Sequence, residues 1–362
     1  MQRPNDGETR SAPADGETLV ACVNHPAEFD AEWLRRRITG CVRPVELLAL
    51  PYKESMALRR ARQAGGLPRE LRDRVPEIGG DLARGLARAE VLMGLDVTES
   101  LLERAPRLRW VQAYSAGTDH FDLELLERRG IALSTASGAG AVPIAEFVIA
   151  RLLEVWKSTR SIETMQRERR FTRPPGRTLA GCTLGIVGLG AIGGAVAERA
   201  RALGMRVLAT RRRFAPGQTS PLADELYGPD GLDDVLERCD ALVLAAPATP
   251  ETRDLIDARA LARLRRGAVL CNVARGALLD ETALIEALCE GRLAAAILDV
   301  TREEPLPPGH PLWDAPNLYL SPHCAVSPDA YDRRVLELFA DNLERYAAGL
   351  PPLNLAVPGE GP

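Results

Sequence analysis

Three short segments of the sequence carry side chains that could bind and protonate a small acid. The first supplies a guanidinium, the second a carboxylate and the third an imidazole. They are Asn272-Val273-Ala274-Arg275-Gly276, Asp299-Val300-Thr301-Arg302-Glu303-Glu304-Pro305, and Ser321-Pro322-His323-Cys324-Ala325.

These groups fit the reduction of a 2-keto acid, which needs a cation for the substrate carboxylate and a proton donor for the carbonyl oxygen. The planar guanidinium of Arg275 matches a carboxylate. His323 suits the proton donor because an ordinary imidazole titrates near ~6.5, and Glu304 beside it would favour the imidazolium. Each residue alone has a structural alternative: a surface arginine, a turn carboxylate and a loop histidine. Their joint occurrence after successive strands favours catalysis.

Two sets of short apolar runs, separated by amphipathic stretches, predict the elements that position these groups. Short runs rich in Val and Leu suit parallel strands that are covered on both faces. The runs are Leu19 to Val23, Val45 to Leu50, Val91 to Gly94, Leu108 to Tyr114 and Ile131 to Thr135, then Thr183 to Val187, Arg206 to Thr210, Ala241 to Ala245, Ala268 to Val273 and Ala294 to Val300. We therefore predict an α/β protein with two doubly wound parallel-sheet domains, one flavodoxin-like and one Rossmann-like, with a cleft between them.

The predicted boundaries place a dinucleotide-binding domain at residues 143–326 and a substrate domain at residues 18–142 with 327–362. Residues 1–17, rich in Asp, Glu, Gly and Pro, are predicted to be a disordered extension. We expect one helix from Pro143 to Arg160 and a last helix from about Tyr331 to Ala348 that returns to the first domain.

A glycine motif, Gly188-Leu189-Gly190-Ala191-Ile192-Gly193, follows a predicted strand and opens a predicted helix. Gly188 permits the tight turn, Gly190 lets the backbone approach a pyrophosphate, and Gly193 lets the helix pack closely. The amides and the dipole at the helix start favour an anion. The alternative is an ordinary strand-to-helix turn, which the strand and helix context disfavours.

The next predicted strand ends in Thr210-Arg211-Arg212, where NAD-specific enzymes carry an acidic residue for the ribose hydroxyls. A hydroxyl followed by guanidinium groups can instead bind a 2′-phosphate, which favours NADP over NAD. The alternative is a solvated loop, because Arg is very abundant here and Lys53 and Lys157 are the only lysines.

Composition narrows the class of protein. A chain of 362 residues with a net charge of −4 has no basic footprint for nucleic acid. Seven cysteines without a C-x-x-C pair predict reduced thiols in a cytoplasmic protein, buried as small core residues. No apolar run approaches the ~20 residues that span a membrane, and no His or Cys cluster has metal-ligand spacing.

The chain resembles the D-isomer-specific 2-hydroxyacid dehydrogenase family over nearly its whole length from Leu19. The resemblance implies that Arg275, Glu304 and His323 form the catalytic triad, and that the backbone amides of Ala116 and Gly117 bind the substrate carboxylate. The motifs that carry it are Gly188 to Gly193, Pro247-Ala248-Thr249-Pro250-Glu251-Thr252, Asn272 to Gly276 with Asp280, Asp299 with Glu304-Pro305, His310-Pro311-Leu312-Trp313, and Pro322-His323. The positions that the resemblance assigns to the cofactor are Ala191, Ile192, Pro247, Thr252, Val273, Asp299 and His323.

Within that family, Thr210-Arg211-Arg212 is similar to the NADPH-preferring glyoxylate and hydroxypyruvate reductases. The absence of a regulatory domain after Pro358 weighs against the longer phosphoglycerate dehydrogenases, and Pro322 stands where formate dehydrogenases have Gln. Cys324 and Phe171 depart from common relatives and leave the substrate's side group open. We expect NAD(P)H-dependent reduction of a small 2-keto acid to the D-2-hydroxy acid by a homodimer. The alternatives are a nicotinamide-sensing co-repressor and a dehydrogenase for bulkier 2-keto acids.

Overall fold

The computed structural model describes residues 17–26, 28–63, 65–118 and 120–356, which form two compact units. One unit comprises the described residues up to Ser137 together with those from Asp332 onward, and the other is Gly138–Tyr331. The predicted N-terminal extension lies outside the described residues except for Glu17, whose carbonyl oxygen accepts a 3.1 Å hydrogen bond from Arg43.

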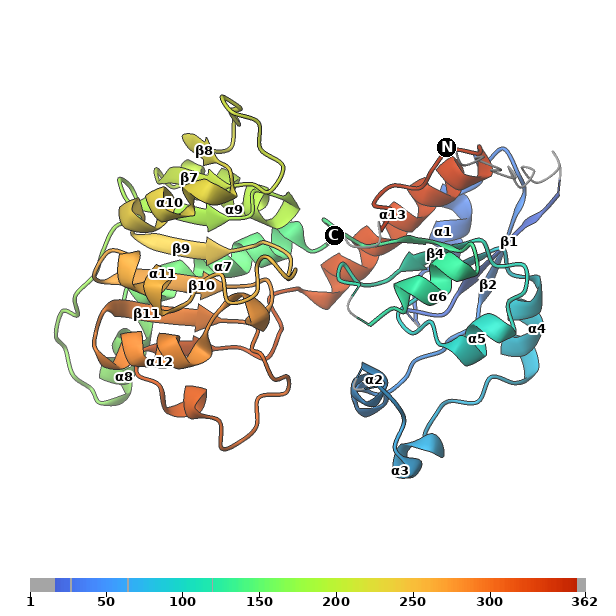
Figure 1. Ribbon diagram of the computed structural model, residues 1–362, viewed down its shortest axis with the longest axis horizontal. Coiled ribbons are helices and arrows are strands. Elements are labelled where there is room, and N and C mark those ends of the chain that lie inside the picture. Colours follow the sequence, from blue (N-terminus) through green and yellow to red (C-terminus); the bar gives the residue numbers. More distant parts are fainter. Residues whose placement is uncertain (1–16, 27, 64, 119, 357–362) are drawn as a thin grey trace, which may run out of the picture. The chain divides into compact units, whose positions relative to one another are not determined.

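The first unit contains a five-stranded parallel sheet of order β2-β1-β3-β4-β5, the flavodoxin-like order (Figure 1). The short apolar runs form its strands, with ends that differ by a few residues at most from the prediction. Its strands are β1 (Leu19–Val23), β2 (Val45–Ala49), β3 (Val91–Gly94), β4 (Trp110–Ala113) and β5 (Ala132–Ser134). Its helices are α1 (Ala31–Arg37), α2 (Met56–Gln63), α3 (Arg69–Arg72), α4 (Gly80–Arg88), α5 (Glu99–Glu103), α6 (Leu123–Arg128) and most of α13 (Pro328–Ala347).

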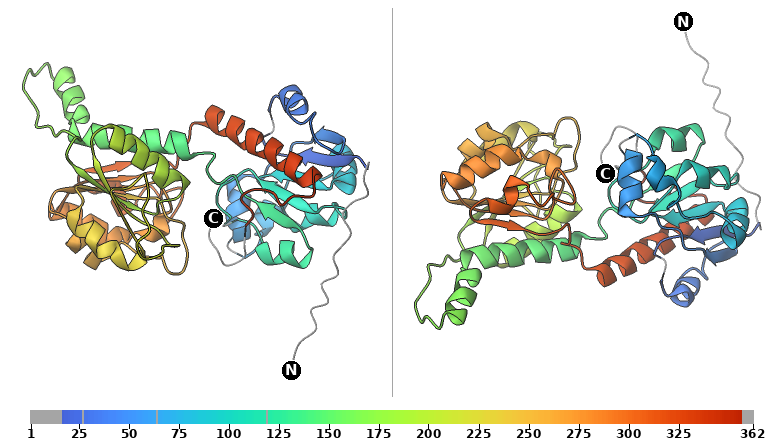
Figure 2. Two further views of the ribbon diagram at one scale, coloured as in Figure 1. Left: turned by 90° about the horizontal axis from the view of Figure 1, so that it is seen from above. Right: turned by 90° about the horizontal axis from the view of Figure 1, so that it is seen from below.

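The chain's last helix, α13, packs on this first sheet although it follows the second set of strands. The ring of Phe339 lies 5.8 Å from that of Trp110, and Asn342 donates a 2.9 Å hydrogen bond to the buried side chain of Gln112. Helices α4, α5 and α6 cover the opposite face through Leu86, Leu101 and other apolar side chains (Figure 2). Both faces of the sheet are therefore covered, which is why its strands are almost wholly apolar.

The second unit contains a seven-stranded parallel sheet of order β12-β11-β10-β9-β6-β7-β8. From β8 toward β11 this is the 3-2-1-4-5-6 order of a dinucleotide-binding fold, with β12 added at the edge. Its strands are β6 (Thr183–Val187), β7 (Arg206–Thr210), β8 (Glu225–Tyr227), β9 (Ala241–Leu244), β10 (Ala268–Asn272), β11 (Leu293–Leu298) and β12 (Leu318–Leu320). The apolar pattern of the sequence does not reveal β8 and β12, because both are short edge strands with half-buried residues and no long apolar run.

Helices cover both faces of the second sheet (Figure 2). Leu184 and Ile186 pack against α7 and α9, whereas Val187 and Leu208 belong to the core under α10, α11 and α12. The helices are α7 (Ala141–Trp156), α8 (Thr159–Arg167), α9 (Ala191–Ala202), α10 (Leu232–Arg238), α11 (Ala258–Arg263) and α12 (Glu281–Cys289), with 3-10 turns η1 (Pro229–Gly231), η2 (Gly276–Leu278) and η3 (Pro311–Asp314). The predicted two-domain α/β fold is confirmed.

Two details of the sequence prediction are wrong. The single helix expected from Pro143 to Arg160 is broken after Trp156, because Ser158 adopts a left-handed backbone conformation with φ of 53° before α8 begins. Cys289 and Cys324 are exposed rather than core residues. The pattern of apolar residues shows neither a short break within a helix nor whether a single cysteine is buried.

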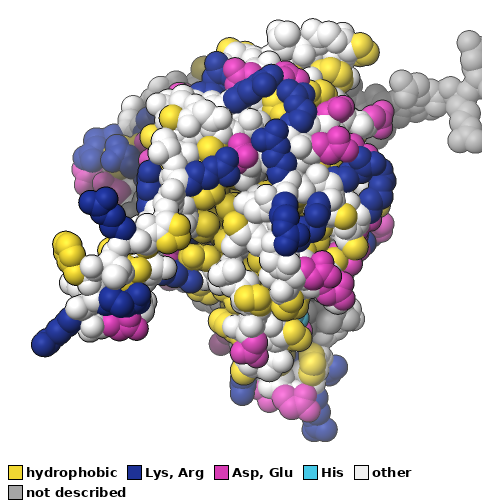
Figure 3. Space-filling model, turned by 90° about the vertical axis from the view of Figure 1, so that its left-hand side faces the viewer, with side chains coloured by type: hydrophobic (Ala, Val, Ile, Leu, Met, Phe, Trp, Pro, Cys, Tyr) yellow, Lys and Arg dark blue, Asp and Glu magenta, His cyan; other side chains and the backbone are white. Residues whose placement is uncertain are grey.

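Arginine and acidic side chains are interspersed on the face of the protein drawn in Figure 3. Many of the arginines form surface ion pairs, such as Arg259 with Asp233 at 2.9 Å and Arg201 with Asp224 at 3.1 Å. Such exposed pairs contribute little stability each. None of the described helices is long and apolar enough to cross a membrane.

Candidate functional site

The glycine turn between β6 and α9 has the geometry that the sequence motif predicts. Gly188 has a φ of 98°, and a Cβ atom on Gly193 would lie 2.1 Å from the Gly188 carbonyl oxygen. Only glycine therefore allows α9 to start so close to the strand. A Cβ atom on Gly190 would meet no described atom within 4 Å, so its backbone borders open space, as do exposed Ala191 and half-buried Ile192 in the first turn of α9.

The end of β7 is tied directly to this turn. The carbonyl oxygen of Thr210 accepts hydrogen bonds from the amides of Gly188 and Leu189, at 3.2 and 2.9 Å. Arg211 and Arg212 follow with exposed side chains. The arginine run therefore begins beside the glycine turn, at the same edge of the sheet.

Pro247, Thr252 and Val273 lie in the connections that follow β9 and β10. The Thr252 hydroxyl donates to the Pro247 carbonyl oxygen at 2.7 Å and accepts from the Thr249 amide at 2.8 Å, which makes a compact loop. Val273 is buried directly after β10. Because parallel strands end at one edge, all of these residues gather there with the glycine turn.

The loop after β10 holds Arg275. Fully buried Asn272 donates to the Arg275 carbonyl oxygen at 2.9 Å and accepts from the Ala274 amide at 3.0 Å. The Arg275 guanidinium donates to the Ala274 carbonyl oxygen at 2.8 Å, and the side chain is half-buried. The amide of Asn272 thus fixes the backbone from which the guanidinium projects.

Glu304 and His323 meet, although nineteen residues separate them in sequence. The Glu304 Oε2 atom lies 2.8 Å from His323 Nδ1, and Glu304 Oε1 accepts from the Thr301 amide at 3.1 Å. Both side chains are partly exposed. With Nδ1 bound to the carboxylate, the other ring nitrogen, Nε2, is the atom that can exchange a proton with a ligand.

The contact between these two groups shifts the pKa of each in the direction that proton donation by His323 needs. The hydrogen bond to Glu304 raises the pKa of His323 above its ordinary value, against the opposing effects of burial and of Arg275. Burial alone would raise the pKa of Glu304, but the hydrogen bond and charge of His323 lower it, with a contribution from Arg275. Arg275 therefore acts electrostatically on both partners, and the three predicted residues follow neighbouring strands of one sheet.

Asp299 fastens the loop that carries His323. Its carboxylate, 2% exposed, accepts from the Ser321 hydroxyl at 2.7 Å and from the amides of Cys324 and Ala325 at 3.0 Å each. Its carbonyl oxygen accepts from the His323 amide at 2.8 Å. The sequence motif predicts only a cofactor contact for Asp299 and gives no sign of this role toward the loop.

The predicted substrate-carboxylate turn, Ser115-Ala116-Gly117, follows β4 in the other unit. The Ser115 hydroxyl donates to the Gly117 carbonyl oxygen at 2.8 Å and lies 3.4 Å from His120 Nε2. Ala116 is half-buried and Gly117 is buried. These contacts give the turn a defined local shape.

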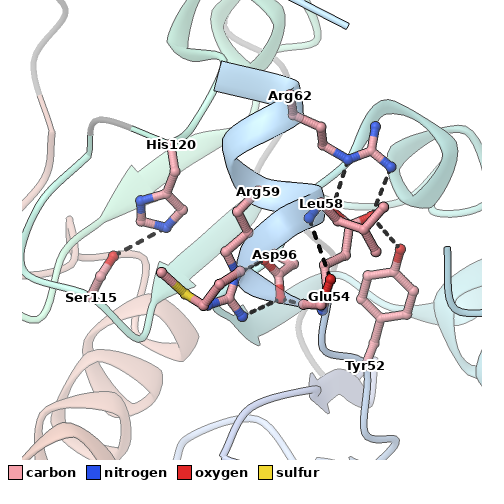
Figure 4. A network of polar contacts seen from close by, with 10 residues as sticks. Tyr52, Glu54, Leu58, Arg59, Arg62, Asp96, Ser115 and His120 are labelled. Atoms are coloured by element: carbon pink, nitrogen blue, oxygen red, sulfur yellow. Dashed lines mark hydrogen bonds and ion pairs between the residues drawn. The ribbon is translucent and has the colours of Figure 1, made fainter. Parts of the chain in front are cut away.

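A buried polar network beside that turn anchors α2 (Figure 4). The Glu54 carboxylate, almost wholly buried, accepts two hydrogen bonds from Arg62 at 2.7 and 2.8 Å and one from the Tyr52 hydroxyl at 3.2 Å. Arg59 binds both oxygens of Asp96 at 2.6 and 2.9 Å. Ion pairs that share several hydrogen bonds fix the geometry of the segments they join. The sequence pattern did not reveal this network.

Asn24 and His25, at the end of β1, are polar residues that no sequence motif singles out. Both are buried, and both polar atoms of the Asn24 amide and the Nδ1 atom of His25 lack a hydrogen-bond partner among the described residues. Burial, followed by the charge of Lys53, lowers the pKa of His25. The pKa of His25 is thus shifted in the opposite direction to that of His323.

Comparison with known proteins places these features in a family. A family model described as D-isomer specific 2-hydroxyacid dehydrogenase, NAD binding domain, matches residues 149–325. The glyoxylate reductase of Aeropyrum pernix is 37% identical over 264 residues, which cover 70% of this chain and 78% of that protein.

Solved structures of similar proteins match nearly the whole chain in fold. A D-isomer specific 2-hydroxyacid dehydrogenase from Xanthobacter autotrophicus Py2, in complex with NADPH and MES, is 28% identical with a TM-score of 0.72, covering 95% of this chain and 99% of that one. An NADPH-dependent glyoxylate/hydroxypyruvate reductase from Sinorhizobium meliloti, in complex with NADP and sulfate, is 25% identical with a TM-score of 0.67, covering 94% and 98%.

The His323–Glu304 contact generates a direct test. In Glu304→Gln the pKa of His323 should fall toward the ordinary imidazole value, because the amide keeps a hydrogen-bond acceptor but loses the charge. The measurement is an NMR pH titration of the ring protons, which is tractable because the chain has only four histidines. Glu303→Gln, one residue away and without this contact, is the control. An unchanged His323 titration in Glu304→Gln would mean that the pair does not form in solution.

Proposed function

The chain belongs to the D-isomer-specific 2-hydroxyacid dehydrogenase family of oxidoreductases, and we propose that it catalyses the NADPH-dependent reduction of a small 2-keto acid of the glyoxylate or hydroxypyruvate type. The product is the D-2-hydroxy acid, and the reaction is reversible. The observation that carries the proposal is the 2.8 Å contact of His323 with Glu304, with Arg275 close enough to influence both pKa values. The names of the glyoxylate-reducing relatives support the substrate type.

The residues of the glycine turn fit a dinucleotide. Gly190 borders open space at the start of α9, where a pyrophosphate can approach the backbone amides. In this proposal Gly188, Gly190, Ala191, Ile192 and Gly193 hold the pyrophosphate. The remaining cofactor residues are Thr210, Arg211 and Arg212 at the ribose phosphate, and Pro247, Thr252, Val273, Asp299 and His323 toward the nicotinamide. The bound cofactor supplies the hydride that reduces the keto carbon.

The chain's own residues bind the acid and move the proton. Arg275 pairs with the substrate carboxylate through its planar fork, and we assign the backbone amides of Ala116 and Gly117 to the same carboxylate. The imidazolium of His323 donates a proton from Nε2 to the carbonyl oxygen as that oxygen gains negative charge. Glu304 stabilises the imidazolium through Nδ1, and in the oxidation direction neutral His323 takes the proton back.

Two features, one on the surface and one of the cysteines, support a cytoplasmic homodimer as part of this proposal. Ile162 in α8 and Phe171 after it expose large apolar side chains, which a second copy could cover. All seven cysteines lack a disulfide partner, which suits a reducing compartment.

The proposed reaction predicts the behaviour of His323→Ala. The rate of NADPH oxidation with glyoxylate or hydroxypyruvate should fall by roughly 10²-fold to 10⁴-fold, the usual contribution of a general acid. Cofactor affinity, followed by NADPH fluorescence, should fall far less than the rate, because His323 is only one of the proposed cofactor residues and the glycine turn is intact. If His323→Ala reduces these acids as fast as the wild type, His323 has no part in the reaction. If the wild-type protein reduces neither these two acids nor bulkier 2-keto acids, the proposed function is refuted.

The arginine run predicts cofactor preference. Wild-type protein should bind NADP more tightly than NAD, and Arg211→Ala with Arg212→Ala should weaken NADP binding by about tenfold or more, since each hydrogen bond to a charged group is worth roughly 1.5–3 kcal/mol. NAD binding should be nearly unchanged. Paired titrations measure both, with Arg167→Ala on exposed α8 as the control for lost positive charge. Tighter binding of NAD by the wild type would contradict the inference.

A further inference from the structure

Glu281, the first residue of α12, has a buried carboxylate that the proposed reaction does not use. Its exposed fraction is 7%, which is unusual for a glutamate. Asp280 already caps the helix by accepting from the amides of Thr282 and Ala283, so the helix start does not require Glu281 for this purpose. The Glu281 Oε1 atom instead accepts a 2.7 Å hydrogen bond from the amide of Arg302, which lies in a different loop.

Arg302 belongs to the turn that presents Glu304. In that turn the Thr301 amide donates to Glu304 Oε1 at 3.1 Å, and the Thr301 hydroxyl donates to the Glu303 carbonyl oxygen at 2.7 Å. The hydrogen bond from Arg302 to Glu281 therefore fixes the peptide immediately beside the one that holds the Glu304 carboxylate.

The same peptide is supported on a second side by Gly276. A Cβ atom there would lie 2.1 Å from the Thr301 carbonyl carbon and 2.3 Å from the Arg302 nitrogen, so the two backbones are in direct contact. Gly276 follows Arg275 in the sequence, which connects the guanidinium loop to the carboxylate turn. Glu281 and Gly276 thus hold the Thr301–Arg302 peptide in one place.

His310 completes the surroundings of Glu281. Its Nδ1 atom accepts from the Leu312 amide at 3.3 Å, which leaves the proton on Nε2, 3.8 Å from Glu281 Oε2. The other charged side chains that border the cavity next to Glu281, about 330 Å³ in volume, are Asp280, Arg302 and Glu303. Burial raises the pKa of Glu281, while the Arg302 amide and then His310 lower it.

We propose that Glu281 is a positioning residue for the catalytic pair: its hydrogen bond to the Arg302 amide holds the turn in the geometry that brings Glu304 Oε2 to His323 Nδ1. The effect of Glu281 on catalysis rests on the proposed function, because Glu281 acts only through the turn that carries Glu304. Loss of the hydrogen bond frees the turn, weakens the Glu304–His323 contact and leaves the imidazolium less stable.

Two substitutions separate positioning from charge. Glu281→Ala removes both the hydrogen-bond acceptor and the charge, whereas Glu281→Gln removes the charge but keeps an amide oxygen for Arg302. Glu286→Ala, on the exposed side of the same helix, is the matched control. Each variant is compared with wild type by an NMR titration of His323, which requires no turnover, and by the pH profile of kcat/KM for 2-keto acid reduction.

The expected result is a lower His323 pKa in Glu281→Ala, with titrations close to wild type in Glu281→Gln and Glu286→Ala. Because reduction needs the protonated imidazole, the fall of kcat/KM at high pH should begin at a lower pH in Glu281→Ala, with a loss of about tenfold above neutrality. A far-ultraviolet circular dichroism spectrum and a thermal unfolding midpoint close to those of the wild type show that the variant is folded.

An unchanged His323 titration in a folded Glu281→Ala variant would overturn the proposal. Equal shifts in the alanine and glutamine variants would also overturn it, since Glu281 would then act only as a charge. Should Glu281→Ala fail to fold, Glu281→Leu takes its place, because leucine also removes the acceptor for the Arg302 amide but fills more of the space, and the same results are expected. The titration of His323 can be measured and interpreted even if the protein reduces no 2-keto acid. Failure of this proposal is therefore distinguishable from failure of the proposed function.

Discussion

The buried carboxylate of Asp299 is the interaction on which the candidate site depends most. It accepts three hydrogen bonds from the loop after β12, and its own backbone accepts a fourth from His323. His323 has a φ of 53°, a left-handed conformation that costs a non-glycine residue roughly 1–3 kcal/mol. Hydrogen bonds to a charged group contribute roughly 1.5–3 kcal/mol each, so three of them outweigh that cost.

The parallel sheet brings the remaining groups to the same loop. Arg275 follows β10, Glu304 follows β11 and His323 follows β12, three neighbouring strands whose carboxyl ends share one edge. Each side chain is then set by a local contact: Asn272 for Arg275, Thr301 for Glu304 and Asp299 for His323. The dinucleotide turn after β6 lies at that edge as well. The fold therefore gathers at one edge of the sheet the groups that we propose bind the ligands and transfer the proton.

The sequence could predict the strands and the chemical types at the site because both have local signals. Buried parallel strands are short apolar runs, and Arg275, Glu304 and His323 each follow such a run or lie in a recognisable motif. The edge strands β8 and β12 lack that signal, since only part of each is buried. The loop role of Asp299 and the hydrogen bond of Glu281 to Arg302 join residues more than twenty positions apart, so no spacing within one segment could reveal them. In the buried polar network, Arg59 pairs with Asp96 37 positions away. Arg62 pairs with Glu54 only eight positions away, but a single arginine gives no signal in a chain where arginine is common.

In the proposed reaction a hydride passes from the bound cofactor to the keto carbon of a 2-keto acid while His323 supplies the proton. The most direct measurement is the fate of deuterium placed on either face of C4 in NADPH, followed by NMR of the product formed from hydroxypyruvate. The account predicts deuterium at carbon 2 of D-glycerate from one of the two labelled cofactors and none from the other. Product without deuterium from either cofactor, or no NADPH-dependent product, would contradict it.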